Sequence, residues 1–235
     1  MPRYIKLIVL IVLCSALHFL TLTPGASLCS DKQRFVIILT TSVTPNIPGR
    51  LHNQSVRLHL YLESIHQWLD NTSLPIVVLD SSNYEFHEIK HPNFKYYSFN
   101  LDRKYGSQTH AEAYSIMKLY NSSMLLGCEY IFKVTGKYFL PNIDTMLDLV
   151  PFNTDIIHTR TIQPIAMGWK NELTPYLWEY LIEGNRGGLE DEVYKFIYPG
   201  SKSVYNGNNL TIFKLPLIKL LKPVQRNYGD WMSQF

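Results

Sequence analysis

The sequence lacks any strongly charged segment. Its formal net charge is +3 at pH 7, and none of its 235 residues belongs to a run of five like charges. Proteins that bind nucleic acids usually carry basic clusters, because much of their affinity comes from neutralising backbone phosphates. The even distribution of charge therefore argues against nucleic acid as a partner.

Internal repeats and low-complexity segments are also absent. The composition is 46% hydrophobic and 13% aromatic, which is typical of a globular chain with a complete core rather than of a disordered one. Residues 31–235 are therefore expected to form one domain, preceded by a separate N-terminal segment over residues 1–30.

Cysteine is scarce, with three residues in the whole chain. Cys14 lies in an apolar segment, which leaves Cys29 and Cys128 as one possible disulfide in an oxidising compartment. Two unpaired thiols are the alternative. The histidines show no spacing typical of a metal site, so no metal-ligating residues are predicted.

The longest apolar run lies near the N-terminus. Arg3 and Lys6 precede LIVLIVLCSALHFLTL at residues 7–22, and basic residues before an apolar segment are typical of a secretory signal. One interpretation is an uncleaved single-pass type II anchor with its basic tip in the cytoplasm. Another is a signal peptide cleaved near Gly25 and Ser27, and a third is a buried helix of the fold. The first predicts a lumenal domain on a Golgi or ER membrane, and the second predicts secretion.

Four Asn-x-Ser/Thr sequences fit a lumenal or extracellular location. The candidate N-glycosylation sites are Asn53, Asn71, Asn121 and Asn209.

Strand and helix patterns alternate after residue 34. Continuous apolar runs predict strands at 35–39, 75–79 and 130–134, with shorter candidates at 95–99, 156–157 and 210–215. Helical periodicity or helix-start signals predict helices at 58–69, 109–120, 174–184 and 189–198. The helix at 109 begins with a Thr109–Glu112 capping box. Such alternation predicts an α/β fold with a mainly parallel sheet and helices on both faces.

Polar residues follow three of these strands. The first is followed by Thr40, Thr41 and Ser42, the second by Asp80, and the third carries Lys133, Thr135, Gly136 and Lys137. Ligands of parallel sheets bind outside the carboxyl ends of the strands, so these residues are expected to line one site.

Lys133 and Lys137 are unusual at the end of a buried strand. One interpretation is a cradle for a diphosphate, in which lysine supplies charge, Thr135 a hydroxyl, and Gly136 close backbone approach. The other is that Lys133 reaches solvent from an edge strand and that Lys137 is solvated. The segment does not match the G-x-x-x-x-G-K-[ST] phosphate loop.

Three further segments carry candidate chemistry. Asp191, and after it Glu190, are candidates for a general base that deprotonates an attacking hydroxyl, although a helix start favours carboxylates in any case. Lys104 and Arg226 are candidates for phosphate contacts. An ordinary polar loop and a disordered C-terminal tail are the respective alternatives.

Residues 33–200 resemble a GT-A glycosyltransferase of the nucleotide-diphospho-sugar transferase type. The resemblance is carried by FVIILTTS at 35–42, PIVVLDSS at 75–82, the segment 104–120 leading to IFKVTGK at 131–137, and GLED at 188–191. It implies a Rossmann-like GT-A fold and transfer of a hexose or pentose from a nucleotide sugar to a hydroxyl of a glycan or glycoconjugate. The implied donor-binding residues are Thr40, Thr41, Ser42, Asp80, Lys104, Lys133, Thr135, Gly136, Lys137 and Arg226.

The sequence departs from this family at the donor phosphates. The family commonly has Asp-x-Asp there, which binds Mn²⁺ or Mg²⁺, whereas this chain has Lys133–Lys137. Our hypothesis is that lysine replaces the metal as counter-charge to the leaving diphosphate, with a divalent metal cofactor as the alternative. A non-catalytic, secreted carbohydrate-binding or transferase-like protein is a competing function. A lumenal sulfotransferase is less favoured, because no phosphate loop follows the first strand.

Overall fold

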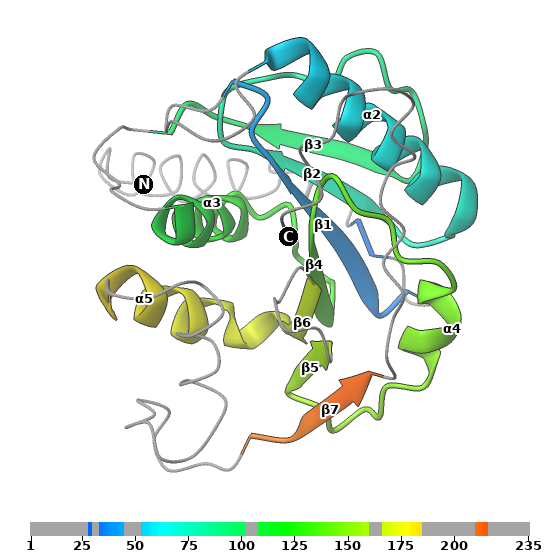
Figure 1. Ribbon diagram of the computed structural model, residues 1–235. Helices are drawn as coiled ribbons and strands as arrows, with labels where there is room; N and C mark the ends of the chain where they lie inside the picture. Colours follow the sequence, from blue (N-terminus) through cyan, green and yellow to red (C-terminus); the bar gives the residue numbers. More distant parts are fainter. Residues whose placement is uncertain are drawn as a thin grey trace, which may run out of the picture.

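The computed structural model describes residues 28–29, 33–44, 53–101, 108–159, 166–184 and 210–215. Within these residues a seven-stranded sheet is covered by helices on both faces (Figure 1). The strands are β1 (Phe35–Thr41), β2 (Ile76–Asp80), β3 (Phe94–Ser98), β4 (Tyr130–Thr135), β5 (Ile156–Thr159), β6 (Ala166–Lys170) and β7 (Ile212–Leu215). The helices are α2 (Gln54–Asn71), α3 (Gln108–Asn121), α4 (Ile143–Asp148) and α5 (Thr174–Gly184), and η1 (Asn171–Leu173) is a short 3-10 turn.

The strand order is β3-β2-β1-β4-β6-β5-β7. β6 pairs antiparallel with both of its neighbours, β4 and β5, and every other neighbouring pair is parallel. Hence β6 alone among the described strands runs against the rest. The α/β class and the mainly parallel sheet expected from the sequence are confirmed.

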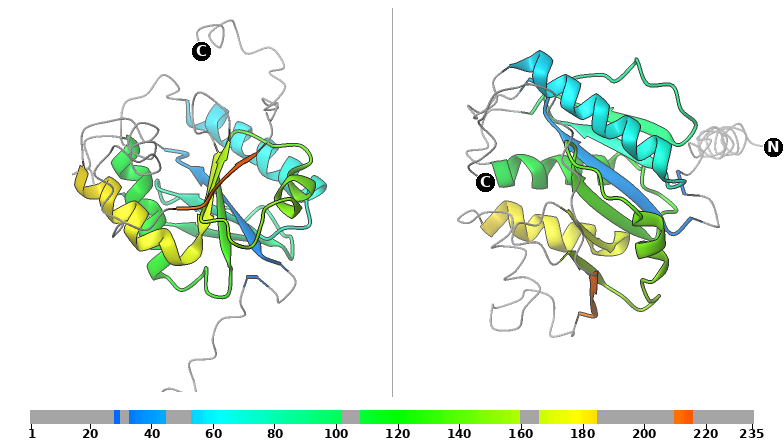
Figure 2. Two further views of the ribbon diagram at one scale, coloured as in Figure 1. Left: turned by 90° about the horizontal axis from the view of Figure 1, so that it is seen from below. Right: turned by 45° about the vertical axis from the view of Figure 1, so that its right-hand side comes forward.

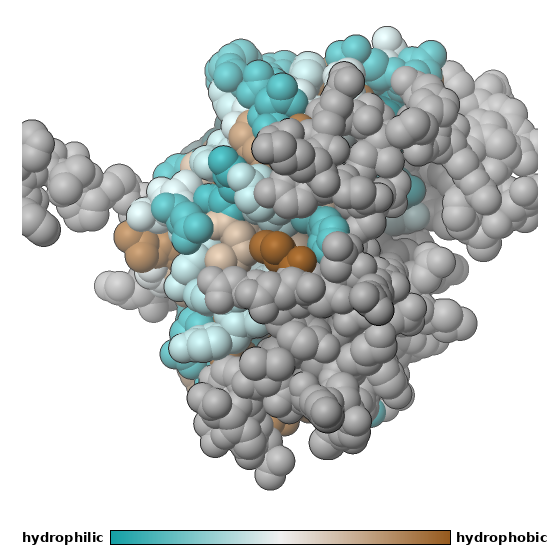
Figure 3. Space-filling model, turned by 90° about the vertical axis from the view of Figure 1, so that its left-hand side faces the viewer, coloured by the Kyte–Doolittle hydropathy of each residue, from teal (hydrophilic) through white to brown (hydrophobic). Residues whose placement is uncertain are grey.

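The central strands have continuous apolar sequences because helices cover both of their faces. On one face α2 and α4 pack against alternate residues of β1, β2 and β4, with Trp68 as the largest buried helix side chain. On the other face lie α3 and α5, with Trp178 buried against the sheet. Figure 2 shows α3 and α5 side by side on that second face. Among the coloured atoms of Figure 3, hydrophilic and pale residues predominate, and the hydrophobic ones form small separate groups.

Two elements, β6 and α4, were not predicted from the sequence. β6 has a glycine at its centre, which weakens the strand pattern. A Cβ atom at Gly168 would lie 2.8 Å from Phe132 Cδ2 and 3.0 Å from Ile157 Cδ1. The glycine is therefore needed so that the neighbouring strands can pack their large side chains across β6.

The expected N-terminal segment at 7–22 and the expected helix at 189–198 lie outside the described residues. Within the described ranges, no helix combines the length and the apolar character needed to cross a bilayer.

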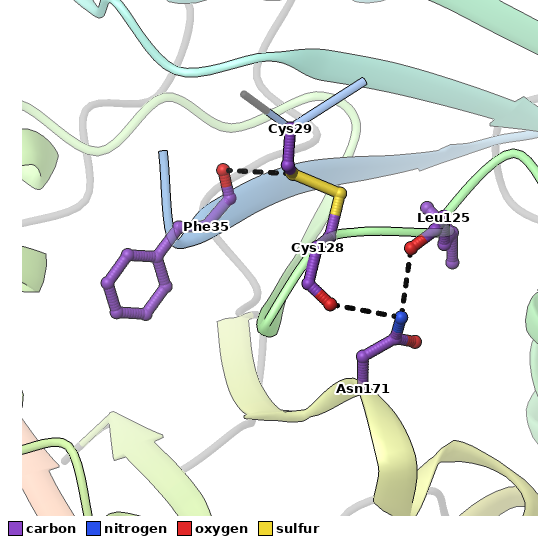
Figure 4. Close-up of a disulfide and its surroundings, with 5 residues drawn as sticks. All are labelled: Cys29, Phe35, Leu125, Cys128 and Asn171. Carbon is purple, nitrogen blue, oxygen red and sulfur yellow. Dashed lines mark hydrogen bonds between the residues drawn. A yellow bond between two sulfur atoms is a disulfide. The ribbon is translucent and has the colours of Figure 1, made fainter. Parts of the chain in front are cut away.

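A disulfide joins Cys29 to Cys128, which lie 99 positions apart in the sequence (Figure 4). It links the segment before β1 to the loop before β4, at the amino-end edge of the sheet. The side-chain amide of Asn171, in η1, donates hydrogen bonds to the carbonyl oxygens of Leu125 (2.9 Å) and Cys128 (3.2 Å). Three segments that are distant in sequence are thereby held together at this edge.

The disulfide closes a long loop, so its removal should widen the unfolded ensemble. We expect the double variant Cys29→Ser/Cys128→Ser to lose about 2–4 kcal/mol of unfolding free energy in urea denaturation. A thiol reductant should lower the stability of the wild type by a similar amount and leave the double variant unchanged. Equal stability of wild type and variant under oxidising conditions would contradict this expectation.

Candidate functional site

The candidate site is the edge where β1, β2 and β4 end. Thr40 lies opposite Thr135 of β4, and Thr41 lies opposite Asp80 of β2. The parallel arrangement therefore brings the polar residues at the ends of three separate strands to one edge, as the sequence predicts.

Asp80 is fully buried and ties two loops together at this edge. Its Oδ1 accepts hydrogen bonds from the backbone N–H of Ser82 (2.8 Å), the Ser82 hydroxyl (2.7 Å) and the backbone N–H of Tyr84 (3.0 Å). Its Oδ2 accepts from the Thr41 hydroxyl (2.9 Å) and the backbone N–H of Val43 (3.2 Å). The carboxylate is thus engaged by the protein's own donors. Asp80 therefore shapes the loops at this edge, and its contact with a donor stays a prediction.

Lys133 is also buried, with 1% of its side chain exposed. Its Nζ lies 2.7 Å from Glu112 Oε1, and the Thr40 hydroxyl donates a hydrogen bond of 2.7 Å to the same oxygen. β4 lies between β1 and β6, so Lys133 is not on an edge strand. Neither interpretation from the sequence therefore describes Lys133. The ammonium is neutralised inside the protein and presents no exposed charge at this edge.

Glu112 was missed as a site residue, because its position suggested a capping box. The helix begins at Gln108, one residue before Thr109, and the Glu112 carboxylate is directed at the sheet. A signal for this contact exists in the sequence. A lysine within a central apolar strand needs a carboxylate partner, and Glu112 is the only acidic residue of α3.

Gly136 permits close approach between two parts of the protein rather than approach of a ligand. Its backbone N–H donates a hydrogen bond of 2.8 Å to the Thr40 carbonyl oxygen. A Cβ atom at this position would lie 2.5 Å from Thr41 Cγ2 and 2.8 Å from the Thr40 oxygen. The chain leaving β4 therefore lies directly against the end of β1.

Lys137 is half-buried in the turn that follows β4. Its Nζ lies 5.2 Å from the centroid of the Tyr138 ring. The Tyr138 carbonyl oxygen accepts hydrogen bonds from Trp68 Nε1 (2.8 Å) and the Ser64 hydroxyl (3.1 Å), both in α2. Helix α2 thus holds this turn in place, and Lys137 is the predicted lysine that retains exposure at the edge.

Arg57 is a second cation of this region that the sequence did not reveal. From the first turn of α2, its Nε donates a 2.7 Å hydrogen bond to the Ser42 carbonyl oxygen, and its Nη2 lies 2.8 Å from the Tyr61 hydroxyl. Burial raises the pKa of Tyr61, and the nearby guanidinium opposes that rise. Ser42 is therefore fixed through its backbone by α2.

His158 lies on β5, opposite Met167 of β6 and Lys214 of β7. Burial lowers the pKa of His158, and the positive charge of Lys214 lowers it further. No hydrogen-bond partner for its Nδ1 is found among the described residues.

Several predicted site residues lie outside the described residues: Asp191, Glu190, Lys104, Arg226 and Asn209. In the described part of the chain, histidine, cysteine, aspartate and glutamate side chains form no group of three that could hold a metal ion.

No model of a known protein family matches this chain, and no curated protein matches it in sequence. Solved structures with a similar arrangement include a Desulfovibrio desulfuricans protein provisionally assigned as a nucleotide-diphospho-sugar transferase (10% identity, TM-score 0.47, covering 78% of this chain and 80% of that one). A glycosyltransferase involved in glycosylation of the major capsid of PBCV-1 has 10% identity and a TM-score of 0.47, covering 77% of this chain and 80% of that one. The galactosyltransferase LgtC, solved with donor and acceptor sugar analogues, has 10% identity and a TM-score of 0.41, covering 68% and 69%.

Replacing only Glu112 of the Lys133–Glu112 pair should destabilise the protein more than replacing both residues. Glu112→Gln leaves a buried ammonium without a counter-charge and should cost about 3 kcal/mol of unfolding free energy. Adding Lys133→Met to that variant should restore much of the loss, because no buried charge then remains. Urea denaturation of the three proteins tests this expectation, and a double variant no more stable than Glu112→Gln would contradict it.

The lowered pKa of His158 should make the free energy of unfolding depend on pH. Because its pKa is lower in the folded protein, the unfolded chain binds the proton first as the pH falls. The free energy of unfolding should therefore decrease below about pH 6.5, the ordinary pKa of histidine, and level off below the folded pKa. His158→Gln should remove this part of the pH dependence, and Lys214→Gln should weaken it. Urea denaturation between about pH 5 and 7.5 measures it, and identical profiles for wild type and His158→Gln would refute it.

Proposed function

We propose that this chain is a glycosyltransferase that moves a hexosyl or pentosyl group from a nucleotide sugar to a hydroxyl of a glycan or glycoconjugate. The observation that carries the proposal is the edge where β1, β2 and β4 end, since open α/β sheets bind ligands there. The resemblance of residues 33–200 to nucleotide-diphospho-sugar transferases supplies the reaction class.

In this proposal the donor diphosphate is met by half-buried side chains of the turn after β4. Lys137 supplies positive charge, and Thr135, half-buried at the end of β4, supplies a hydroxyl. Lys104 and Arg226 are further candidate phosphate contacts. Lys133, Glu112 and Asp80 are positioning residues, because their polar atoms are engaged within the protein.

In this proposal no divalent metal is held by the described residues of this edge. Asp80 is the carboxylate best placed to hold one, but both of its oxygens accept hydrogen bonds from protein donors. The proposed reaction therefore assigns the counter-charge of the leaving diphosphate to basic side chains, with Lys137 first among them.

The proposed general base is Asp191, with Glu190 as the alternative. The carboxylate accepts the proton of the acceptor hydroxyl as its oxygen forms a bond to the anomeric carbon of the donor sugar. The bond between that carbon and the diphosphate oxygen breaks, and the leaving diphosphate carries the electron pair.

The proposed location of residues 31–235 is the lumen of the Golgi or ER, or the exterior of the cell. The Cys29–Cys128 disulfide supports it, because disulfides persist in oxidising compartments. The apolar run at 7–22 would be a membrane anchor in the first case and a cleaved signal in the second.

Thermal unfolding with a panel of nucleotide sugars tests donor binding. One donor should raise the melting temperature, because a ligand at 100 times its Kd adds about 2.7 kcal/mol to stability. The shift should persist with EDTA and shrink in Lys137→Ala. It should remain in the control variant Lys90→Ala, which removes an exposed cation from the segment between β2 and β3.

The outcomes separate the competing functions. A shift that requires Mn²⁺ would keep the donor site and discard the role of Lys137. No shift with any donor would contradict the proposal and favour a carbohydrate-binding protein. Asp191→Asn should retain the donor shift and abolish transfer, whereas full activity in that variant would exclude Asp191 as the base.

A further inference from the structure

The amino-end edge of the sheet, opposite the candidate donor site, contains an open pocket of about 710 Å³. It lies where α3 ends, where β4 begins and where β6 leads into η1. Its lining includes Tyr120, Asn121, Leu126, Glu129, Phe152 and Lys170. The size falls within the range of roughly 300–1,000 Å³ that is usual for pockets that enclose small ligands. Aromatic rings, carboxylate and ammonium groups thus share one concave surface.

Asn121 places a possible attachment point for a sugar inside this lining. It is the last residue of α3, it is exposed, and Ser122 and Ser123 complete an Asn-x-Ser sequence. Within the described part of the chain, no hydrogen bond to its side-chain amide is found. The other two described sequences differ, because Asn71 Nδ2 donates to the Gln67 carbonyl oxygen and Asn53 Oδ1 caps α2.

Phe152 supplies a platform in the same pocket. Its residue is 73% exposed, which is unusual for a phenylalanine. The Arg34 guanidinium lies 3.7 Å from the ring centroid, and Arg34 is itself held by Glu129 (3.1 Å) and by the Val150 carbonyl oxygen (3.2 Å). One side of the ring is therefore fixed by a positioned cation, and the large exposed fraction leaves apolar surface for another group.

We infer that this pocket holds the first sugars of an N-linked glycan attached to Asn121. The apolar C–H face of a sugar ring would cover Phe152. Glu129, beyond its contact with Arg34, and Lys170, beyond its ion pair with Asp155 (3.2 Å), would supply further hydrogen bonds to the sugar's hydroxyl and amide groups. The glycan is tethered to the lining itself, so its effective concentration at the pocket is high. The inference rests on the proposed lumenal location and not on transferase activity.

The test uses the full chain expressed in a eukaryotic secretory host. Mass spectrometry of the Asn121 peptide measures occupancy, and peptide N-glycosidase treatment of the folded protein measures how fast each glycan is released. The Asn121 glycan should be released roughly tenfold more slowly than that of Asn53, since a stacking contact of about 1.4 kcal/mol gives that factor. Denaturation should remove the difference.

Two variants show whether Phe152 causes the protection. Phe152→Ser should bring the release rate at Asn121 close to that at Asn53, and should lose the stabilising effect of the glycan seen when wild type is compared with Asn121→Gln. Tyr176→Ser removes another exposed aromatic side chain outside the pocket lining and should change neither quantity.

Each result decides the inference. An unmodified Asn121 with glycans at Asn53 or Asn71 overturns it and leaves the lumenal location intact. Absence of glycans at every site overturns both. A glycan at Asn121 that is released as fast as that at Asn53, or whose release is unaffected by Phe152→Ser, overturns the pocket's role alone.

Discussion

The buried ion pair between Lys133 and Glu112 is the contact on which the arrangement of this protein's central layers depends. A charged group in the middle of a sheet is costly unless it is paired, so the helix that carries Glu112 has to lie over β4 at that point. Thr40 donates to the same carboxylate oxygen and brings β1 into the contact. The pair thereby sets the position of α3 relative to the two strands that end at the candidate site.

Asp80 has a parallel function in β2, on the other side of β1. Lys133 fixes a helix to the sheet, and Asp80 fixes the loops that leave β1 and β2. Both residues lie where a ligand-binding group was expected, and both are engaged by the protein itself. The described part of the edge is therefore a frame held together by internal contacts. Lys137 and Thr135 lie half-buried at the turn after β4, and the proposal places the donor contact there.

The sequence predicted the α/β class, most strands and the three main helices, because long apolar or periodic segments depend little on distant contacts. It did not predict β6, whose central glycine is explained only by the packing of Phe132 and Ile157 across it. It also did not reveal the internal contacts of Lys133 and Gly136. Their residue types suit a phosphate site, and only the neighbours from β1 and α3 show that they serve internal packing. Partners separated by tens of residues are not visible in a local pattern.

The single reversed strand has a consequence for the path of the chain. Because β6 runs against the sheet, it returns the chain to the amino-end edge, and α5 then leads away from that edge along the face it shares with α3 (Figures 1 and 2). The last residue of α5, Gly184, consequently lies toward the edge where β1 and β4 end. Asp191 follows Gly184 by seven positions (184 to 191), a span of at most about 25 Å for an extended chain. The reversal of β6 thus places the end of α5, the last described helix, toward the side of the sheet that carries the candidate site.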